Sequence, residues 1–177
     1  MWPKLERILP LASLNKVRAL PFMTHIKNLF GDFTISDEED VGREEMYWRI
    51  VRPNCAEDVG PIHADKWFWE LGHGHMPLEK KRVKVWIPIF SEPNKNGLIV
   101  IPDSHISDWK YHGERRHGLL KPVCDEPIEK FNKQLLPLSP GEVVIFNDGL
   151  LHGGAINKGS ATRVSLEFTI FVDEKKS

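Results

Sequence analysis

The sequence predicts a mainly β protein in which an antiparallel sandwich or barrel follows a helical N-terminal part. From about residue 46, short segments rich in β-branched and aromatic residues are separated by turn sequences about every 8–12 residues, as in all-β sandwiches and barrels. Helical spacing of apolar residues is concentrated in the first thirty residues. Because helical patterns do not alternate with the predicted strands, a parallel βαβ architecture is not expected.

The first thirty residues are expected to form two short helices. Their apolar residues recur at close to helical spacing, and Pro10 and Pro21 interrupt the pattern. We expect these helices to pack against the outside of the barrel. The acidic run at 37–40 predicts an exposed loop, since such clusters are usually solvated.

Several segments after residue 45 have the composition of strands, and turn sequences such as SEPNKNG and LSPGE separate them. Residues 70–82, with glycine and proline, predict a flexible connection. Residues 103–135 predict an irregular insertion with one short helix near 128–136. The predicted strands are residues 46–51, 63–69, 83–90, 98–101, 143–146 and 163–172.

The length of 177 residues fits one domain comfortably. We therefore expect a single domain over residues 1–177. Its helical part spans residues 1–45, and its β core spans residues 46–172 with the insertion at about 103–135.

Composition excludes several classes of partner. The formal net charge of -1 gives no basic footprint for nucleic acid or for an anionic membrane. No apolar stretch reaches the roughly 20 residues of a membrane span, and the N-terminal segment lacks the apolar core of a secretory signal. The two cysteines, Cys55 and Cys124, do not make a disulfide framework. These features predict a soluble cytoplasmic protein with neither nucleic acid nor membrane as a partner.

The tripeptide His63-Ala64-Asp65 is a candidate metal-binding motif. If this segment is extended, the side chains of His63 and Asp65 project to the same face. An imidazole and a carboxylate on one face form two thirds of the two-His, one-carboxylate triad that holds Fe(II) with open coordination positions. A third ligand from a distant strand is therefore expected.

His152 is the candidate for that third ligand, because it follows a predicted strand and turn and lies among glycines that allow close backbone approach. Arg163 and Ser165 share a face of the last predicted strand. A guanidinium inside a barrel needs an anionic partner and matches a carboxylate through a bidentate fork. Taken alone, these residues are equally compatible with a surface histidine and an exposed strand arginine.

The order of the motifs resembles the phytanoyl-CoA dioxygenase family of Fe(II)- and 2-oxoglutarate-dependent oxygenases. The resemblance covers about residues 46–172, and the arginine eleven residues after the second histidine is its most specific feature. The motifs are, in order, His63-Ala64-Asp65, Trp86-Ile87-Pro88, the segment from Asn96 to His105, the segment from Gly141 to Phe146, His152 and Arg163-Val164-Ser165.

The resemblance implies a double-stranded β-helix, which is a cupin-like jelly roll. It implies that His63, Asp65 and His152 bind Fe(II), with no catalytic residue beyond these ligands. It also implies that Arg163, assisted by Ser165, binds the distal carboxylate of 2-oxoglutarate. The implied reaction uses O2 to hydroxylate an unidentified small organic substrate, with succinate and CO2 as coproducts. Halogenating relatives carry Gly or Ala in place of Asp65, so the carboxylate favours hydroxylation.

Other binding residues are less closely defined. The resemblance places Trp86 beside the cosubstrate, and Arg49 is a candidate for a basic residue that contacts the cosubstrate or the substrate. Strand alternation would place Trp67 and Trp69 on the side of Asp65, near a substrate, although aromatic residues are as often part of a core.

An alternative metal motif, a possible lid and an alternative function also stay open. The HxHxxxE spacing of His73, His75 and Glu79 resembles a metal motif of small-molecule-binding cupins, but Pro77 interrupts it. Residues 105–117 are a candidate lid over the pocket. The chain could also be a non-catalytic or differently metallated cupin-like protein that binds a small molecule.

Overall fold

The computed structural model describes residues 3, 5–116 and 119–174. None of the helices in this part of the chain has the length and apolarity needed to cross a membrane. The helical elements are η1 (Leu5–Arg7), α1 (Leu11–Arg18), α2 (Pro21–Phe30), η2 (Ala56–Asp58), α3 (Asp65–Glu70), η3 (Ser104–Ile106) and η4 (Ile128–Lys130). The strands are β1 (Phe33–Ile35), β2 (Tyr47–Val51), β3 (Lys80–Phe90), β4 (Leu98–Val100), β5 (Tyr111–Arg116), β6 (Leu119–Cys124), β7 (Gln134–Leu135), β8 (Val144–Asn147), β9 (His152–Gly154) and β10 (Arg163–Asp173).

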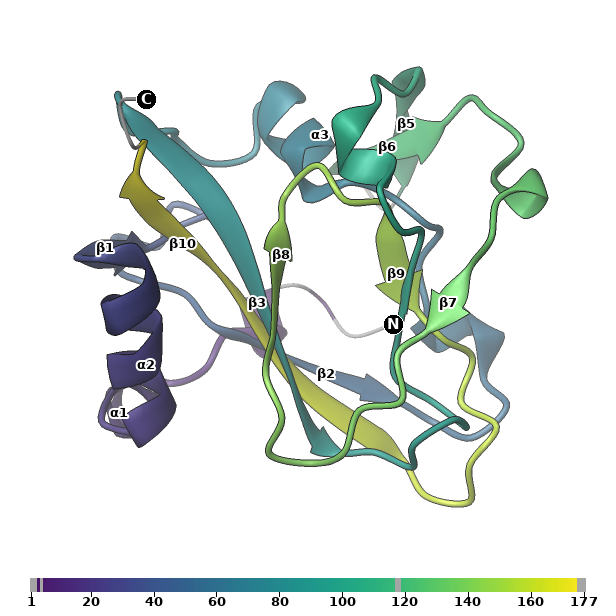
Figure 1. Ribbon diagram of the computed structural model, residues 1–177, viewed down its shortest axis with the longest axis horizontal. Coiled ribbons are helices and arrows are strands. Elements are labelled where there is room, and N and C mark those ends of the chain that lie inside the picture. The colour runs from purple at the N-terminus through teal and green to yellow at the C-terminus, as the bar shows by residue number, and fades with distance from the viewer. Residues whose placement is uncertain (1–2, 4, 117–118, 175–177) are drawn as a thin grey trace.

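The larger sheet is antiparallel and is built around β10. Its order is β1-β10-β3-β8, and β2 pairs with the first half of β10 beside β1. The two helices predicted in the first thirty residues are confirmed, and they cover one face of this sheet (Figure 1). On that face, Leu14 and Ile26 of the helices join Val85 and Phe168 of the sheet in one buried core.

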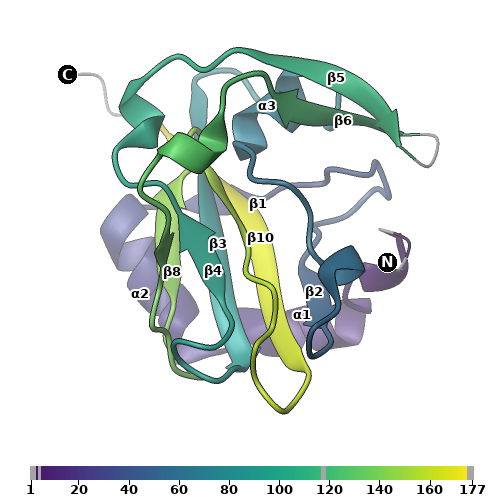
Figure 2. The same cartoon turned by 90° about the vertical axis from the view of Figure 1, so that its right-hand side faces the viewer.

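The smaller sheet has the order β7-β4-β9, and a backbone bridge between His63 and His152 extends it by one short segment. It faces the uncovered side of the larger sheet, as the view in Figure 2 shows. A second core cluster joins the two layers, with Trp86 and Phe146 from the larger sheet and Leu98 from the smaller one. The predicted antiparallel β architecture is therefore confirmed.

The register of the larger sheet decides which side chains enter the space between the sheets. Cross-strand partners share a face, and β10 pairs Glu167 with Trp86 and Thr169 with Lys84. The intervening Phe168 pairs with Val85 and points into the helix-covered core. Alternate residues of β3 and β10 therefore carry polar groups to the interior of the barrel.

The prediction of a strand at 63–69 was wrong, because helix α3 begins at Asp65. Aromatic residues favour strands through their packing, so local propensity yields to tertiary contacts. Here Ala64 is extended and the chain turns into a helix at Asp65, where an acidic side chain suits the first turn. Residues two apart in a helix point in nearly opposite directions, so Trp67 does not lie on the side of Asp65.

The insertion is more regular than the sequence predicted. Strands β5 and β6 form an antiparallel hairpin, while the helix expected near 128–136 is reduced to the single turn η4 followed by β7. The hairpin packs on α3, where the ring of Trp67 stacks on that of Tyr111 with centroids 4.8 Å apart. The candidate lid at 105–117 spans η3 and β5, except that His117 lies outside the described residues. Its role as a lid stays a prediction.

Replacing Tyr111 by leucine is expected to lower the free energy of unfolding by about 1 kcal/mol, since an aromatic pair contributes about 0.5–1.5 kcal/mol beyond its buried area. The hairpin should also exchange its amide hydrogens faster than the larger sheet does. Urea denaturation and hydrogen exchange test this expectation. Arg115→Ala is the control, because Arg115 is exposed on the same strand. Equal destabilisation by both variants would contradict a specific role for the stacked pair.

Candidate metal centre

Three predicted ligands converge at one end of the barrel interior. The backbone N–H groups of His63 and His152 donate to each other's carbonyl oxygens over 3.0 and 2.9 Å, which brings the two histidines side by side. Asp65 enters from the start of α3. His63 Nε2 is 3.5 Å from Asp65 Oδ1, and His152 Nε2 is 3.6 Å from Asp65 Oδ2. Within the described part of the chain, this is the only set of three such side chains whose ligand atoms lie within 4.8 Å of one another.

Backbone carbonyls orient both imidazoles toward this centre. His63 Nδ1 lies 2.9 Å from the carbonyl oxygen of Pro61, and His152 Nδ1 lies 2.9 Å from that of Leu150. Each Nδ1–H therefore donates to a carbonyl, which leaves the Nε2 lone pair free for a metal. Burial lowers the pKa of His152 to about 4, so this imidazole is neutral near pH 7.

Asp65 is held in its ionised form. Burial alone would raise the pKa of its carboxyl group, but Lys84 and the two histidines outweigh burial and bring the pKa well below its usual value. Lys84 Nζ is 3.3 Å from Asp65 Oδ2, and the lysine side chain is only 7% exposed. Two imidazoles and one carboxylate are the donor set of a facial metal triad with open positions.

Arg163 is buried beside this centre and lacks a carboxylate partner among the described residues. Its Nη1 donates to the carbonyl oxygen of Gly97 over 2.7 Å, while its Nε has no hydrogen-bond partner there. Burial and then the positive charge of Arg49 lower the pKa of Arg163 to about 10, so the guanidinium remains charged at pH 7. The buried hydroxyl of Ser165 also lacks a partner among these residues. A buried cation without a counter-ion is costly, so this corner has an unmet capacity for an anion.

Space for an anion exists next to the guanidinium. The guanidinium lies over the ring of Trp86, whose centroid is 5.8 Å from the Arg163 Cζ atom. On the facing strand β9, a Cβ atom added to Gly154 would lie 3.6 Å from Arg163 Nη2. Gly154 therefore lies close against the guanidinium, and both residues line the same pocket.

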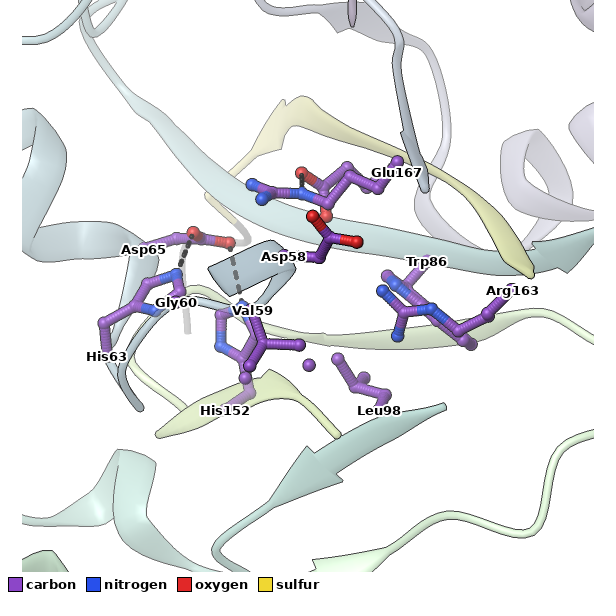
Figure 3. Close-up of a pocket in the computed structure, with 13 residues that line it drawn as sticks. Asp58, Val59, Gly60, His63, Asp65, Trp86, Leu98, His152, Arg163 and Glu167 are labelled. Atoms are coloured by element: carbon purple, nitrogen blue, oxygen red, sulfur yellow. Dashed lines mark hydrogen bonds and ion pairs between the residues drawn. The ribbon is translucent and has the colours of Figure 1, made fainter. Parts of the chain in front are cut away.

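A second ion pair lines the same pocket (Figure 3). Arg49 Nε is 2.5 Å from Glu167 Oε1. Burial would raise the pKa of Glu167, but Arg49 and Lys84 outweigh burial and lower the pKa to about 2. Glu167 thus balances Arg49, and of the two guanidinium groups that line this pocket, Arg163 is the one without a carboxylate partner among the described residues.

The structure brings most of the predicted site residues into one pocket. The pocket walls include the three candidate ligands together with Arg49, Trp86 and Arg163. Trp67 and Trp69 are not among the described lining residues. Trp67 is completely buried in a core cluster, and Trp69 packs between Arg82 and Phe171. The alternation that suggested a substrate contact for these tryptophans does not exist in a helix.

The alternative metal motif is not assembled in the described structure. His73 Nε2 contacts the carbonyl oxygen of Leu120 over 2.7 Å, which ties the loop after α3 to the hairpin. Neither His75 nor Glu79 joins His73 in a group of possible ligands within the described residues.

Sequence reasoning missed Lys84 and Glu167. Both are charged residues at inward-facing positions of long apolar strands. Each lies on the same face of its strand as a predicted site residue. Lys84 lies two residues before Trp86, and Glu167 lies two residues after Ser165. The two-residue spacing was therefore the sequence signal that could have placed both charges inside the barrel.

Comparisons with known proteins agree with the geometry. The family described as phytanoyl-CoA dioxygenase (PhyH) matches residues 15–165. No curated protein matches the chain. The solved structure of EvdO2 from Micromonospora carbonacea var. aurantiaca complexed with 2-oxoglutarate is 14% identical, with a TM-score of 0.60 over 96% of this chain and 68% of that one. AviO1 from Streptomyces viridochromogenes Tue57 is 15% identical, with a TM-score of 0.57 over 94% of this chain and 64% of that one.

A third solved structure is the epimerase SnoN in complex with Fe3+, alpha ketoglutarate and nogalamycin RO. It is 12% identical, with a TM-score of 0.56 over 92% of this chain and 59% of that one. The chain therefore spans less than two thirds of the length of AviO1 and of SnoN. These likenesses concern the fold, and with the two facing sheets they confirm the predicted double-stranded β-helix. Because the family match covers most of its length, the chain belongs to the phytanoyl-CoA dioxygenase (PhyH) family.

Proposed function

We propose that this protein is a non-haem Fe(II)- and 2-oxoglutarate-dependent dioxygenase that hydroxylates a small organic substrate. The observation that carries the proposal is the presence, in one pocket, of a two-His, one-carboxylate triad and a buried arginine without a carboxylate partner among the described residues. Membership of the family and the 2-oxoglutarate bound to EvdO2 support it. We further propose that the whole chain acts as one oxygenase domain. The cytoplasmic location stays a prediction.

The residues divide into a metal half and a cosubstrate half. His63, Asp65 and His152 would hold Fe(II) on one face, which leaves the remaining positions for exogenous ligands. Arg163 would bind the distal carboxylate of 2-oxoglutarate through its planar fork, and Ser165 would donate its hydroxyl to the same carboxylate.

Bound iron and 2-oxoglutarate would supply the oxidative chemistry that couples O2 and decarboxylation, to succinate and CO2, to oxidation of a substrate C–H bond. The chain contributes orientation and exclusion of water. Trp86 forms an apolar wall beside Arg163, and Leu98 lines the pocket from the smaller sheet, so the cosubstrate would be screened from solvent. Retention of Asp65 supports hydroxylation as the reaction type.

Anaerobic addition of Fe(II) and then 2-oxoglutarate is expected to produce the weak visible charge-transfer band of a chelated keto acid. Asp65→Ala should abolish the band and weaken metal binding, because one of three ligands is lost. Asp125→Ala is a matched control, since Asp125 lies on the hairpin, paired with His112 away from the pocket. Exposure of the wild-type complex to O2 should then release succinate.

Two results would contradict the proposal. Absence of the band, together with unchanged metal affinity in Asp65→Ala, would show that the triad does not bind the metal. Metal binding without any response to 2-oxoglutarate would favour a cupin-like binding protein.

A further inference from the structure

A lysine side chain lies inside the barrel beside the metal ligand Asp65. Lys84 is in β3, which pairs with β10 on one edge and with β8 on the other, so its backbone is fixed on both sides. Its neighbour Val85 belongs to the helix-covered core, which directs Lys84 to the opposite face, toward the pocket. A lysine here is not needed to fill the apolar core, and its position calls for an electrostatic explanation.

The ammonium group of Lys84 contacts one oxygen of Asp65. Nζ lies 3.3 Å from Oδ2, and the two side chains are 7% and 12% exposed. Oδ2 has no hydrogen-bond partner in the described structure. Of the two basic groups that lie near this oxygen, Lys84 at 3.3 Å is closer than His152 at 3.6 Å. Two other carboxylates act on the charge of Lys84: Glu167 is engaged by Arg49 at 2.5 Å, and Glu38 accepts a hydrogen bond from Thr169 over 2.9 Å. Lys84 and Asp65 are therefore each other's direct partners.

We infer that Lys84 is a positioning residue, whose ammonium group holds Asp65 Oδ2 and so limits how the carboxylate can rotate beside the two histidines. This inference rests on the proposed function, because it concerns the same metal site. A facial triad keeps its open positions only if the carboxylate occupies a single one. Without Lys84, the carboxylate could rotate or offer both oxygens. Partners that orient metal ligands typically change metal affinity by about 10- to 100-fold when they are removed.

The test uses Co(II), whose binding can be followed spectroscopically without oxygen or 2-oxoglutarate. Lys84→Met keeps an unbranched side chain one atom shorter but removes the charge, and it is expected to weaken Co(II) binding by about 10-fold or more. The Co(II) absorption spectrum should also change, because the coordination by Asp65 changes. Lys84→Arg restores a cation and should recover most of the affinity. Lys81→Met is the matched control, since Lys81 lies on the same strand and is exposed.

The stability of each metal-free variant is measured in parallel, so that a folding defect is separated from a change at the site. If Lys84 were only a structural ion-pair partner, Lys84→Met would lower stability while the folded protein kept its Co(II) affinity and spectrum. That result would overturn the inference and leave the proposed function intact. Tighter Co(II) binding by Lys84→Met would overturn it as well, because repulsion between the cations would then dominate. If the wild-type protein bound no Co(II), both the inference and the proposed function would fail.

Discussion

Replacing Arg163 by methionine is expected to weaken the binding of 2-oxoglutarate by about 100-fold. Loss of one partner of a buried charge pair typically costs about 2–5 kcal/mol, and each 1.4 kcal/mol is a factor of about ten in affinity. The guanidinium is 2% exposed and lacks a carboxylate partner among the described residues, so the distal carboxylate of the cosubstrate would be its main counter-charge. Calorimetric titration of the Co(II)-loaded protein with 2-oxoglutarate, under anaerobic conditions, measures the change.

A second variant separates charge from geometry. Arg163→Lys retains the positive charge but loses the planar fork, so its affinity should lie between those of the wild type and the methionine variant. Arg115→Met, on the exposed face of the hairpin, is the control. Because Arg163 is a buried cation without a direct carboxylate partner among the described residues, methionine should not destabilise the metal-free fold. If Arg163→Met bound 2-oxoglutarate normally, or if it unfolded the protein, Arg163 would have a structural role instead.

The long strands could be predicted from the sequence because both of their faces are specified. In the last strand, predicted at 163–172 and found at 163–173, apolar residues alternate with inward-facing polar ones. The same alternation placed Arg163 and Ser165 on one face. This strand is paired on both edges in the larger sheet, so its side chains keep the alternation of faces that the sequence predicts.

The metal motif was identified for a reason that proved only half correct. His63 is extended, as expected, and its backbone also pairs with that of His152, but Asp65 belongs to a helix. The ligands still converge, because the backbone is extended through Ala64 and turns into the helix only at Asp65. Trp67 could not be placed from local sequence, since the ring that stacks on it comes from Tyr111, more than forty residues further along the chain. Contacts of this kind depend on tertiary structure, which local patterns do not encode.

The interior charges were the larger omission. Lys84 ends a basic run that begins at Lys80, and Glu167 is a single charge in an apolar strand, so both were taken to face solvent. In the folded protein they lie between Asp65 and Arg49, so that acidic and basic groups alternate across the pocket. This alternation lets several buried charges coexist, while the guanidinium of Arg163 has no carboxylate partner among the described residues.

The charge network should also make the fold sensitive to acid. Glu167 has its pKa lowered from an ordinary 4.5 to about 2, since Arg49 and Lys84 outweigh the effect of burial. A carboxylate with a lowered pKa contributes stability that is present above pH 4.5 and is lost as the pH falls toward 2. The shift corresponds to about 3 kcal/mol. Glu167→Gln is therefore expected to lower the free energy of unfolding by about 3 kcal/mol at pH 7, as measured by urea denaturation.

The difference between the wild type and Glu167→Gln should shrink as the pH falls from 5 to 2, because the wild-type carboxylate becomes neutral as well. Asp65 also has a lowered pKa, but it is present in both proteins and so largely cancels in this difference. Glu129→Gln, an exposed change on η4, should show no such dependence. A difference that stayed constant across this pH range would mean that glutamine disturbs packing rather than charge. A difference that became small by pH 2 would identify Glu167 as the counter-charge that holds Arg49.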